Sequence, residues 1–166
     1  MPHVTSFAAI EDASASVLIL GSMPGVLSLR EQQYYAHPRN VFWGIMGELM
    51  GAYPSEPYER RVNLLRSRKI ALWDVLQSCT REGSLDSAID ETTLVTNDFT
   101  SFYQSHPGIE RVYFNGSKAE QVYRRYVKDV IVDLSPRIHY QRLPSTSPAH
   151  AAKSFEEKLA VWKCIV

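Results

Sequence analysis

The chain has little cysteine, since only Cys79 and Cys164 occur among its 166 residues. Two thiols are too few for a four-thiolate zinc or iron–sulfur site, and they do not suggest the disulfide framework of a small secreted domain. We therefore expect both cysteines to be reduced.

Long hydrophobic runs are also absent. No stretch of about 18 uncharged apolar residues occurs, so a membrane-spanning helix is not indicated. The N-terminus has no basic segment followed by an apolar one, so a secretory signal peptide is not indicated either. We expect an intracellular, cytoplasmic protein that has no membrane partner.

The chain also lacks an excess of charge of one sign, because 18 basic and 18 acidic residues give a net charge of zero. No global field attracts nucleic acid, so any such binding must be local. Two basic clusters, within residues 60–69 and 118–128, fit solvated helix faces. The length suits one domain, placed at residues 1–166, and a monomer is the expectation.

Short apolar runs of the β type alternate with helical patterns along most of the chain. We predict strands at residues 17–20, 70–73, 112–114 and 138–143. We predict helices at residues 40–49, 58–65, 97–103, 118–127 and 151–161, with Asn97 capping the third. Residues 1–15 and 80–96 are expected to be irregular. The alternation predicts an α/β fold in which helices cover both faces of a mainly parallel sheet.

Each predicted strand is followed at once by a small, polar or otherwise unusual segment. These segments are Gly21–Gly25, Trp73–Asp74, Asn115–Ser117 and Pro144–His150. The carboxyl ends of parallel strands lie on one edge of a sheet, where ligands bind. Four such loops predict a single site, although glycine, serine and proline also punctuate ordinary turns. In the last loop, Ser147 before Pro148 predicts a helix cap whose free N–H groups could meet phosphate.

Five segments together resemble a known family, the uracil-DNA glycosylase superfamily, and within it the hypoxanthine-DNA (deoxyinosine) glycosylase branch. In chain order they read GSMPG, YYAHPRNVFW, ALWDVLQSCTREGSLD, FNGSKA and LPSTSPAH, within a region from about Val17 to Ala151. The resemblance implies a three-layer α/β sandwich with a central four-stranded, mainly parallel sheet flanked by helices. It also implies base excision, in which a damaged base is flipped out of DNA, held in a pocket and cut from its deoxyribose.

The resemblance places base-binding residues in the first two motifs. Phe42 matches the aromatic residue on which relatives stack the base, a contact worth about 1–3 kcal/mol. Its alternative role is plain helix core. Ser22 and Met23 belong to the first motif, which can supply shape and backbone donors.

Asp74 is the fourth base-binding candidate, because it falls where relatives place an asparagine that reads the edge of uracil. An ionised Asp74 can accept the N1–H of hypoxanthine, and a protonated one can also donate to a carbonyl. The alternative role is a cap of the turn that follows the strand.

The resemblance assigns catalysis to Asn40. Other branches carry Asp or Asn immediately before the first motif's proline, but Met23 stands there in this chain and cannot orient water. In the hypoxanthine branch an asparagine at the place of Asn40 takes this role. An amide oxygen can orient water, which suffices if cleavage passes through an oxocarbenium-like state. A helix N-cap is the competing role for Asn40.

The loop Ser145–Ser147 matches the segment with which relatives enter the minor groove and compress phosphates. Ser145 stands where relatives often carry a histidine that stabilises the departing base, and a serine can donate only a neutral hydrogen bond. We assign Ser145 a catalytic role. We assign DNA binding to the polar and small residues of two loops: Asn115, Gly116, Ser117, Thr146 and Ser147. Residues Arg81–Ser84 could also contact phosphate, although a surface turn explains them equally well.

The predicted function is that of a monofunctional DNA glycosylase that initiates base excision repair, with hypoxanthine preferred and uracil as a second candidate. No lysine stands at a motif position, so no Schiff-base intermediate is expected, and neither a metal nor an organic cofactor is implied. The partner is DNA that carries a deaminated base. Two alternatives stay open: a mismatch-specific uracil or thymine glycosylase of the same superfamily, and a catalytically silent nucleic-acid-binding domain.

Overall fold

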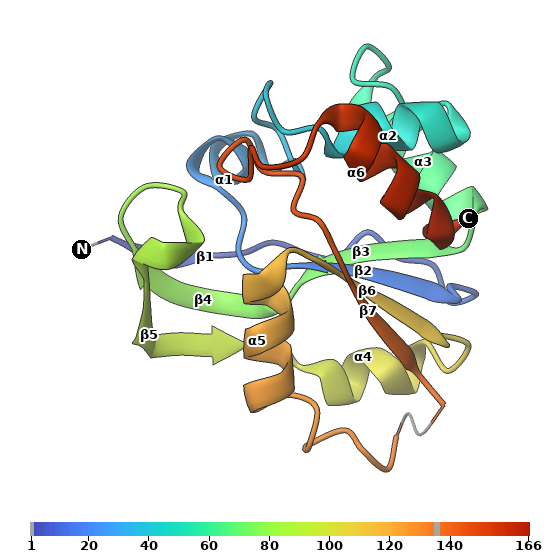
Figure 1. Cartoon of the computed structure of the whole chain (residues 1–166). Helices are drawn as coiled ribbons and strands as arrows, with labels where there is room; N and C mark the ends of the chain where they lie inside the picture. The colour runs from blue at the N-terminus through green and yellow to red at the C-terminus, as the bar shows by residue number, and fades with distance from the viewer. Residues whose placement is uncertain (1, 135–136) are drawn as a thin grey trace.

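A four-stranded parallel sheet lies at the centre of the computed structural model, which describes residues 2–134 and 137–166 (Figure 1). Its strands, in spatial order, are β3 (Ile70–Asp74), β2 (Val17–Gly21), β6 (Arg111–Asn115) and β7 (His139–Leu143). All neighbouring strands in it run parallel. Every residue of β2 is buried, which explains its continuous apolar sequence. The four predicted strands are confirmed.

Helices form a layer on each face of this sheet (Figure 1). One face carries α2 (Phe42–Met50), α3 (Tyr58–Ser67) and α6 (Phe155–Trp162), and the other carries α4 (Phe99–Ser105) and α5 (Ser117–Tyr126). Each layer encloses an apolar core, one containing Trp162 and the other Tyr123. The short helix α1 (Val26–Glu31) lies in the loop after β2. The expected three-layer α/β sandwich is confirmed.

A second, antiparallel sheet contains part of the chain that was expected to be irregular. Its middle strand β4 (Leu76–Arg81) pairs with β1 (His3–Thr5) and with β5 (Ile89–Thr96). The expectation of irregular structure is therefore wrong for residues 3–5, 80–81 and 86–96, whereas residues 6–15 and 82–85 form no helix or strand. The sequence pattern misses β5 because it is an edge strand of mostly polar residues, of which only Ile89 is buried.

Two predicted helix starts are also corrected. Asp98, rather than Asn97, caps α4, because its side chain accepts the backbone N–H three residues later. Asn97 instead donates its side-chain amide to backbone carbonyls of β3 and β4. The helix α6 begins at Phe155, behind a capping box that opens with Ser154. Ser147 therefore caps no helix, and the loop around it is a turn.

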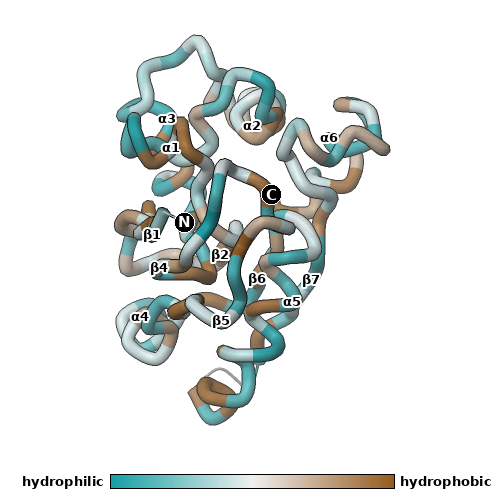
Figure 2. Tube along the Cα trace, turned by 90° about the vertical axis from the view of Figure 1, so that its left-hand side faces the viewer, coloured by the Kyte–Doolittle hydropathy of each residue, from teal (hydrophilic) through white to brown (hydrophobic). Residues whose placement is uncertain are grey.

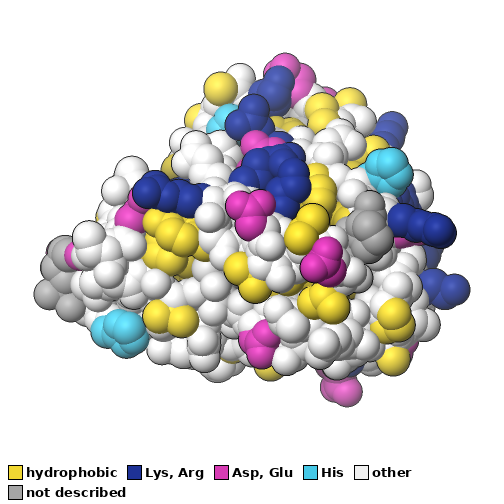
Figure 3. Space-filling view, turned by 90° about the horizontal axis from the view of Figure 1, so that it is seen from below, with side chains coloured by type: hydrophobic (Ala, Val, Ile, Leu, Met, Phe, Trp, Pro, Cys, Tyr) yellow, Lys and Arg dark blue, Asp and Glu magenta, His cyan; other side chains and the backbone are white. Residues whose placement is uncertain are grey.

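The surface carries mixed charge. Figure 3 shows basic side chains interspersed with acidic and hydrophobic ones on the face seen from below. The segment 127–134 after α5 is largely hydrophobic (Figure 2), and it exposes Val130 and Val132.

Within residues 2–134 and 137–166, no helix is long and apolar enough to cross a membrane. Cys79 and Cys164 are free thiols, as expected.

Candidate functional site

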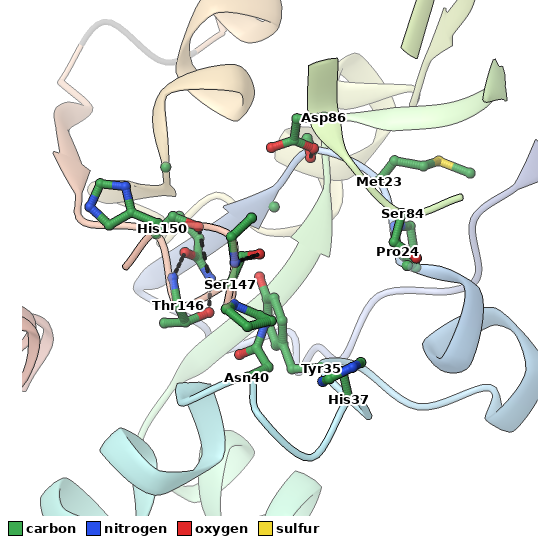
Figure 4. Close-up of a pocket in the computed structure, with 18 of the residues that line it drawn as sticks. Met23, Pro24, Tyr35, His37, Asn40, Ser84, Asp86, Thr146, Ser147 and His150 are labelled. Carbon is green, nitrogen blue, oxygen red and sulfur yellow. Dashed lines mark hydrogen bonds between the residues drawn. The ribbon is translucent and has the colours of Figure 1, made fainter. Parts of the chain in front are cut away.

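A cavity of about 1050 Å³ opens at the carboxyl edge of the parallel sheet (Figure 4). The loops that follow β2, β6 and β7 contribute to its wall, and β3 contributes its last residue, Asp74. They converge because parallel strands end at a common edge, where β2 and β3 finish level with each other at Gly21 and Asp74. Every predicted site residue except Phe42 lines it: Ser22, Met23, Asn40, Asp74, Asn115, Gly116, Ser117, Ser145, Thr146 and Ser147.

Asn40 lies just before α2, half-buried in the cavity wall. Its amide oxygen accepts a hydrogen bond from the Phe42 N–H at 3.0 Å, and the N-cap residue of α2 is Val41 rather than Asn40. This bond uses only one of the two lone pairs of that oxygen. The Val41 N–H donates to the Thr146 carbonyl at 3.1 Å and ties this segment to the loop after β7. Asn40 is thus held in place and keeps hydrogen-bonding capacity for water or a ligand.

Asn115 and Thr146 form a reciprocal pair. Asn115 Nδ2 donates to Thr146 Oγ1, and the Thr146 N–H donates to Asn115 Oδ1, both at 2.9 Å. Both residues are buried, with Thr146 only 1% exposed. The pair joins the loops after β6 and β7, and it occupies the polar groups that the sequence prediction assigns to DNA. The two hydrogen bonds therefore hold these loops together.

Local hydrogen bonds shape the rest of these two loops. Ser145 Oγ accepts the Ser147 N–H, and Ser147 Oγ accepts the Ala149 N–H, each at 3.2 Å. Gly116 has φ +94°, and a Cβ built on it would lie 3.1 Å from Ser145 Cβ. Close approach of the two loops therefore favours glycine. Ser117 is exposed in the first turn of α5, where it is free to meet a ligand.

Tyr35, rather than Phe42, presents an aromatic ring to the cavity (Figure 4). Phe42 is fully buried and does not line the cavity, because α2 turns it into the core. The Tyr35 ring packs against it, with centroids 4.3 Å apart and planes tilted by 33°. The prediction that Phe42 faces the cavity is therefore wrong, and Tyr35 lies at the cavity wall in its place. Tyr35 has φ +55°, an uncommon backbone conformation for a residue other than glycine.

Asp74 is 3% exposed at the end of β3. It does not cap the following turn, because the Val75 N–H donates to the Gly21 carbonyl at 2.8 Å, so the capping alternative is wrong. Burial first, and then the negative charge of Asp86, raise the pKa of Asp74, the positive charge of Arg81 opposes them, and together they bring this pKa to about 7. Asp74 therefore titrates near neutral pH.

The turn between β4 and β5 supplies a further part of the cavity wall, of which the sequence prediction considered Ser84 but not Asp86. Ser84 and Asp86, from the turn between these strands, line the cavity (Figure 4). Asp86 Oδ1 accepts a hydrogen bond from Ser22 Oγ at 2.5 Å, across 64 positions of sequence. The phosphate role considered for Arg81 is wrong, because its fully buried guanidinium donates to the Pro24 carbonyl at 2.5 Å. The sequence pattern does not indicate this contact, because β5 is an edge strand of mostly polar residues.

Positively charged side chains border the cavity at Arg39, Arg142 and Lys153. His37 and His150 lie at the same border, and His150 precedes α6. Within the part of the chain that the structure describes, no group of three or more His, Cys, Asp or Glu could hold a metal ion.

Comparison with known proteins finds close relatives. Hypoxanthine DNA glycosylase from Methanosarcina acetivorans is 40% identical over 114 residues, which cover 68% of this chain and 71% of the relative. The protein of the same name from Methanosarcina barkeri is 39% identical, with the same coverage. The solution NMR structure of a candidate uracil DNA glycosylase from M. acetivorans has a TM-score of 0.78 and 32% identity, and covers 99% of both chains. No protein-family model matches the chain.

Proposed function

The chain belongs to the hypoxanthine DNA glycosylase family of the uracil-DNA glycosylase superfamily, and we propose that it is a monofunctional glycosylase that removes a deaminated base from DNA. Hypoxanthine is the preferred base and uracil a second substrate. The observation that carries the proposal is the cavity in which Asn40, Tyr35 and Asp74 converge. The protein acts as a monomer of one domain and needs no cofactor.

The cavity has room for an extruded base and its sugar. Flipping a base out of the duplex costs a few kcal/mol, and less for a mispaired base. Stacking on the Tyr35 ring recovers about 1–3 kcal/mol. Phe42 supports that ring from beneath, so the stacking surface is in place before DNA arrives.

Asn40 orients the attacking water. Its amide oxygen is fixed by the Phe42 N–H and offers its second lone pair to a water hydrogen. An amide is a weak base, so the C1′–N bond breaks first, and water then attacks an oxocarbenium-like sugar. Ser145 donates its hydroxyl hydrogen toward the departing base. That hydrogen is available because Ser145 Oγ serves as an acceptor toward the Ser147 N–H.

Binding to DNA relies on local contacts, because the chain has no net charge. Arg39, Arg142 and Lys153 at the cavity border meet phosphates on either side of the flipped base. Ser117 adds a neutral hydrogen bond, and so does the Ser147 hydroxyl, whose oxygen accepts the Ala149 N–H and whose hydrogen can point to phosphate.

Single-turnover release of free base tests this function, using duplexes that contain deoxyinosine, deoxyuridine or deoxyxanthosine. We expect fastest release of hypoxanthine, and a loss of about 100-fold or more in Asn40→Ala, because the water is no longer positioned. Asn63→Ala is the matched control, since Asn63 is exposed on α3, away from the cavity lining. Its rate should equal that of the wild type.

Other outcomes separate the alternatives. Activity on uracil alone would indicate a mismatch-type relative, and binding without release would indicate a catalytically silent reader of lesions. Borohydride treatment during turnover should trap no adduct. A trapped adduct would contradict the monofunctional assignment and would first implicate Lys153, which borders the cavity.

A further inference from the structure

Two carboxyl groups face the cavity from different sheets. Asp74 ends β3 in the parallel sheet, and Asp86 lies in the turn between β4 and β5. Asp86 is exposed and accepts the Ser22 hydroxyl, whereas Asp74 is buried. Asp86 therefore keeps contact with solvent, and Asp74 is the one for which a charge is costly.

The two oxygens of Asp74 have different surroundings. Oδ2 is buried and has no hydrogen-bond partner among the described residues. Oδ1 lies at Gly21, where a Cβ would come within 2.5 Å of it and within 3.0 Å of the Tyr35 hydroxyl. Gly21 thus leaves room for Oδ1 beside the ring that lines the cavity. Oδ1 is the oxygen that a ligand can reach.

Charged and titratable groups surround Asp74 on several sides. The Asp86 charge comes from the hairpin turn and Arg81 from β4, and the phenols of Tyr34 and Tyr35 come from the loop after α1. Burial keeps both phenols neutral by raising the pKa of each above its ordinary value. The Arg81 guanidinium is directed at backbone carbonyls of the first motif. Among residues 2–134 and 137–166, Asp74 has no direct cationic partner to hold it ionised.

In a neutral Asp74 the proton belongs on Oδ1. A proton on Oδ2 would be a buried donor with no acceptor, and orphaned donors are rarer in proteins than under-satisfied acceptor oxygens. A neutral Asp74 therefore presents a hydroxyl donor to the cavity. The donor is on Oδ1, because Oδ2 is buried behind it.

We propose that Asp74 reads the exocyclic carbonyl of the flipped base by donating a hydrogen bond from a protonated Oδ1, and that Asp86 is the positioning residue that favours this neutral form. This inference rests on the proposed glycosylase function. Deamination replaces an exocyclic amino donor by a carbonyl acceptor, so a fixed donor pairs with the lesion and opposes the normal amino group. Asp74 can thereby recognise both hypoxanthine and uracil.

The test is the pH profile of single-turnover release from a deoxyinosine duplex between pH 6 and pH 8. The wild-type rate should fall about tenfold across this range, because the donor form is lost as pH rises through about 7. Asp74→Asn should remain active with a flat profile, since its amide N–H donates without titrating.

Asp86→Asn keeps an acceptor for Ser22 and removes the charge. The midpoint should move to lower pH, so the rate at pH 8 falls by about threefold relative to wild type, the change for a half-unit shift. Asp90→Asn is the matched control, because Asp90 is in the same hairpin, outside the cavity lining, and accepts hydrogen bonds from Thr92. Its profile should match that of the wild type.

A wild-type rate that rises with pH and loses this rise in Asp74→Asn would overturn the proposal in favour of an ionised acceptor. An Asp86→Asn profile that superimposes on the wild type would overturn the role of Asp86. Release with the wrong pH dependence contradicts this inference alone, whereas absence of release from every variant at every pH contradicts the proposed function itself.

A second measurement tests the hydrogen bond to the exocyclic carbonyl by itself. Deoxynebularine carries a purine that lacks the exocyclic oxygen of hypoxanthine, so its release loses the proposed hydrogen bond. The ratio of deoxyinosine to deoxynebularine rates should be about tenfold larger in the wild type than in Asp74→Ala, as one lost hydrogen bond requires. An equal ratio in both proteins would overturn the contact.

Discussion

The carboxyl group of Asp74 shows how surroundings decide the chemistry of a residue. Free in water it would be ionised at neutral pH, but burial and the Asp86 charge raise its pKa from 3.8 to about 7. The folded protein therefore holds this proton more strongly than the unfolded chain. Stability from this group is complete at acidic pH and is lost as pH rises toward 7.

Asp74→Asn should accordingly stabilise the protein more at alkaline than at acidic pH. The free energy of unfolding of the variant relative to wild type should increase by about 2–3 kcal/mol between pH 5 and pH 8. Urea denaturation at both pH values measures this change. A difference that does not depend on pH would show that Asp74 keeps its ordinary pKa.

Gly116 is a second residue whose identity depends on its surroundings, because it combines φ +94° with the nearby Ser145. Gly116→Ala should cost about 1–2 kcal/mol of stability and displace the Ser145 loop, which slows base release about tenfold. Gly51→Ala is the control, since Gly51 has φ +82° with nothing within 4 Å of an added Cβ. It should lose similar stability and keep its rate.

At the scale of elements, α6 holds the loop that carries Ser145. Trp162 Nε1 donates to the Pro144 carbonyl at 2.9 Å, and Lys158 Nζ donates to the His150 carbonyl at 2.7 Å. The two hydrogen bonds hold the loop at both ends. The helix thereby connects the hydrophobic core with the loop that is proposed to meet DNA.

Lys158→Met should weaken this connection and preserve the packing of the side chain. We expect base release to slow by about fivefold, the effect of one hydrogen bond, with little change in melting temperature. Lys163→Met removes the same charge at an exposed position and serves as the control. Equal rates in both variants would show that the bond to His150 does not order the loop.

At the scale of the whole molecule, zero net charge means that DNA affinity depends on a few contacts around the cavity. On the face seen in Figure 3, acidic and basic side chains are interspersed. Long-range attraction is therefore weak, and phosphate contacts at the border carry the salt dependence.

The salt dependence of binding measures these contacts. In the Asn40→Ala background with a deoxyinosine duplex, replacing Arg39, Arg142 or Lys153 by Ala should each reduce the slope of log K against log salt by about 1. Arg60→Ala, an exposed position on α3 paired with Glu56, should leave the slope unchanged. A common slope for all variants would contradict the proposed DNA path.

The sequence by itself determined the parallel sheet and the place of the site. Apolar runs such as Val17–Leu20 can only be buried on both faces, and parallel strands bring their following loops to one edge. The resemblance of the motifs to those of the family then indicated Asn40 and the loop after β7 as parts of the site, and both line the cavity. These features follow from local pattern and from a rule of topology.

Only the tertiary structure decided which atoms face the cavity. The Tyr35 ring covers Phe42 because α2 directs Phe42 into the core. Asp86 reaches Ser22 through a pairing of polar strands that leaves no hydrophobic period in the sequence. The pKa of Asp74 depends on burial and on that distant charge, and such properties exist only once non-local contacts have formed.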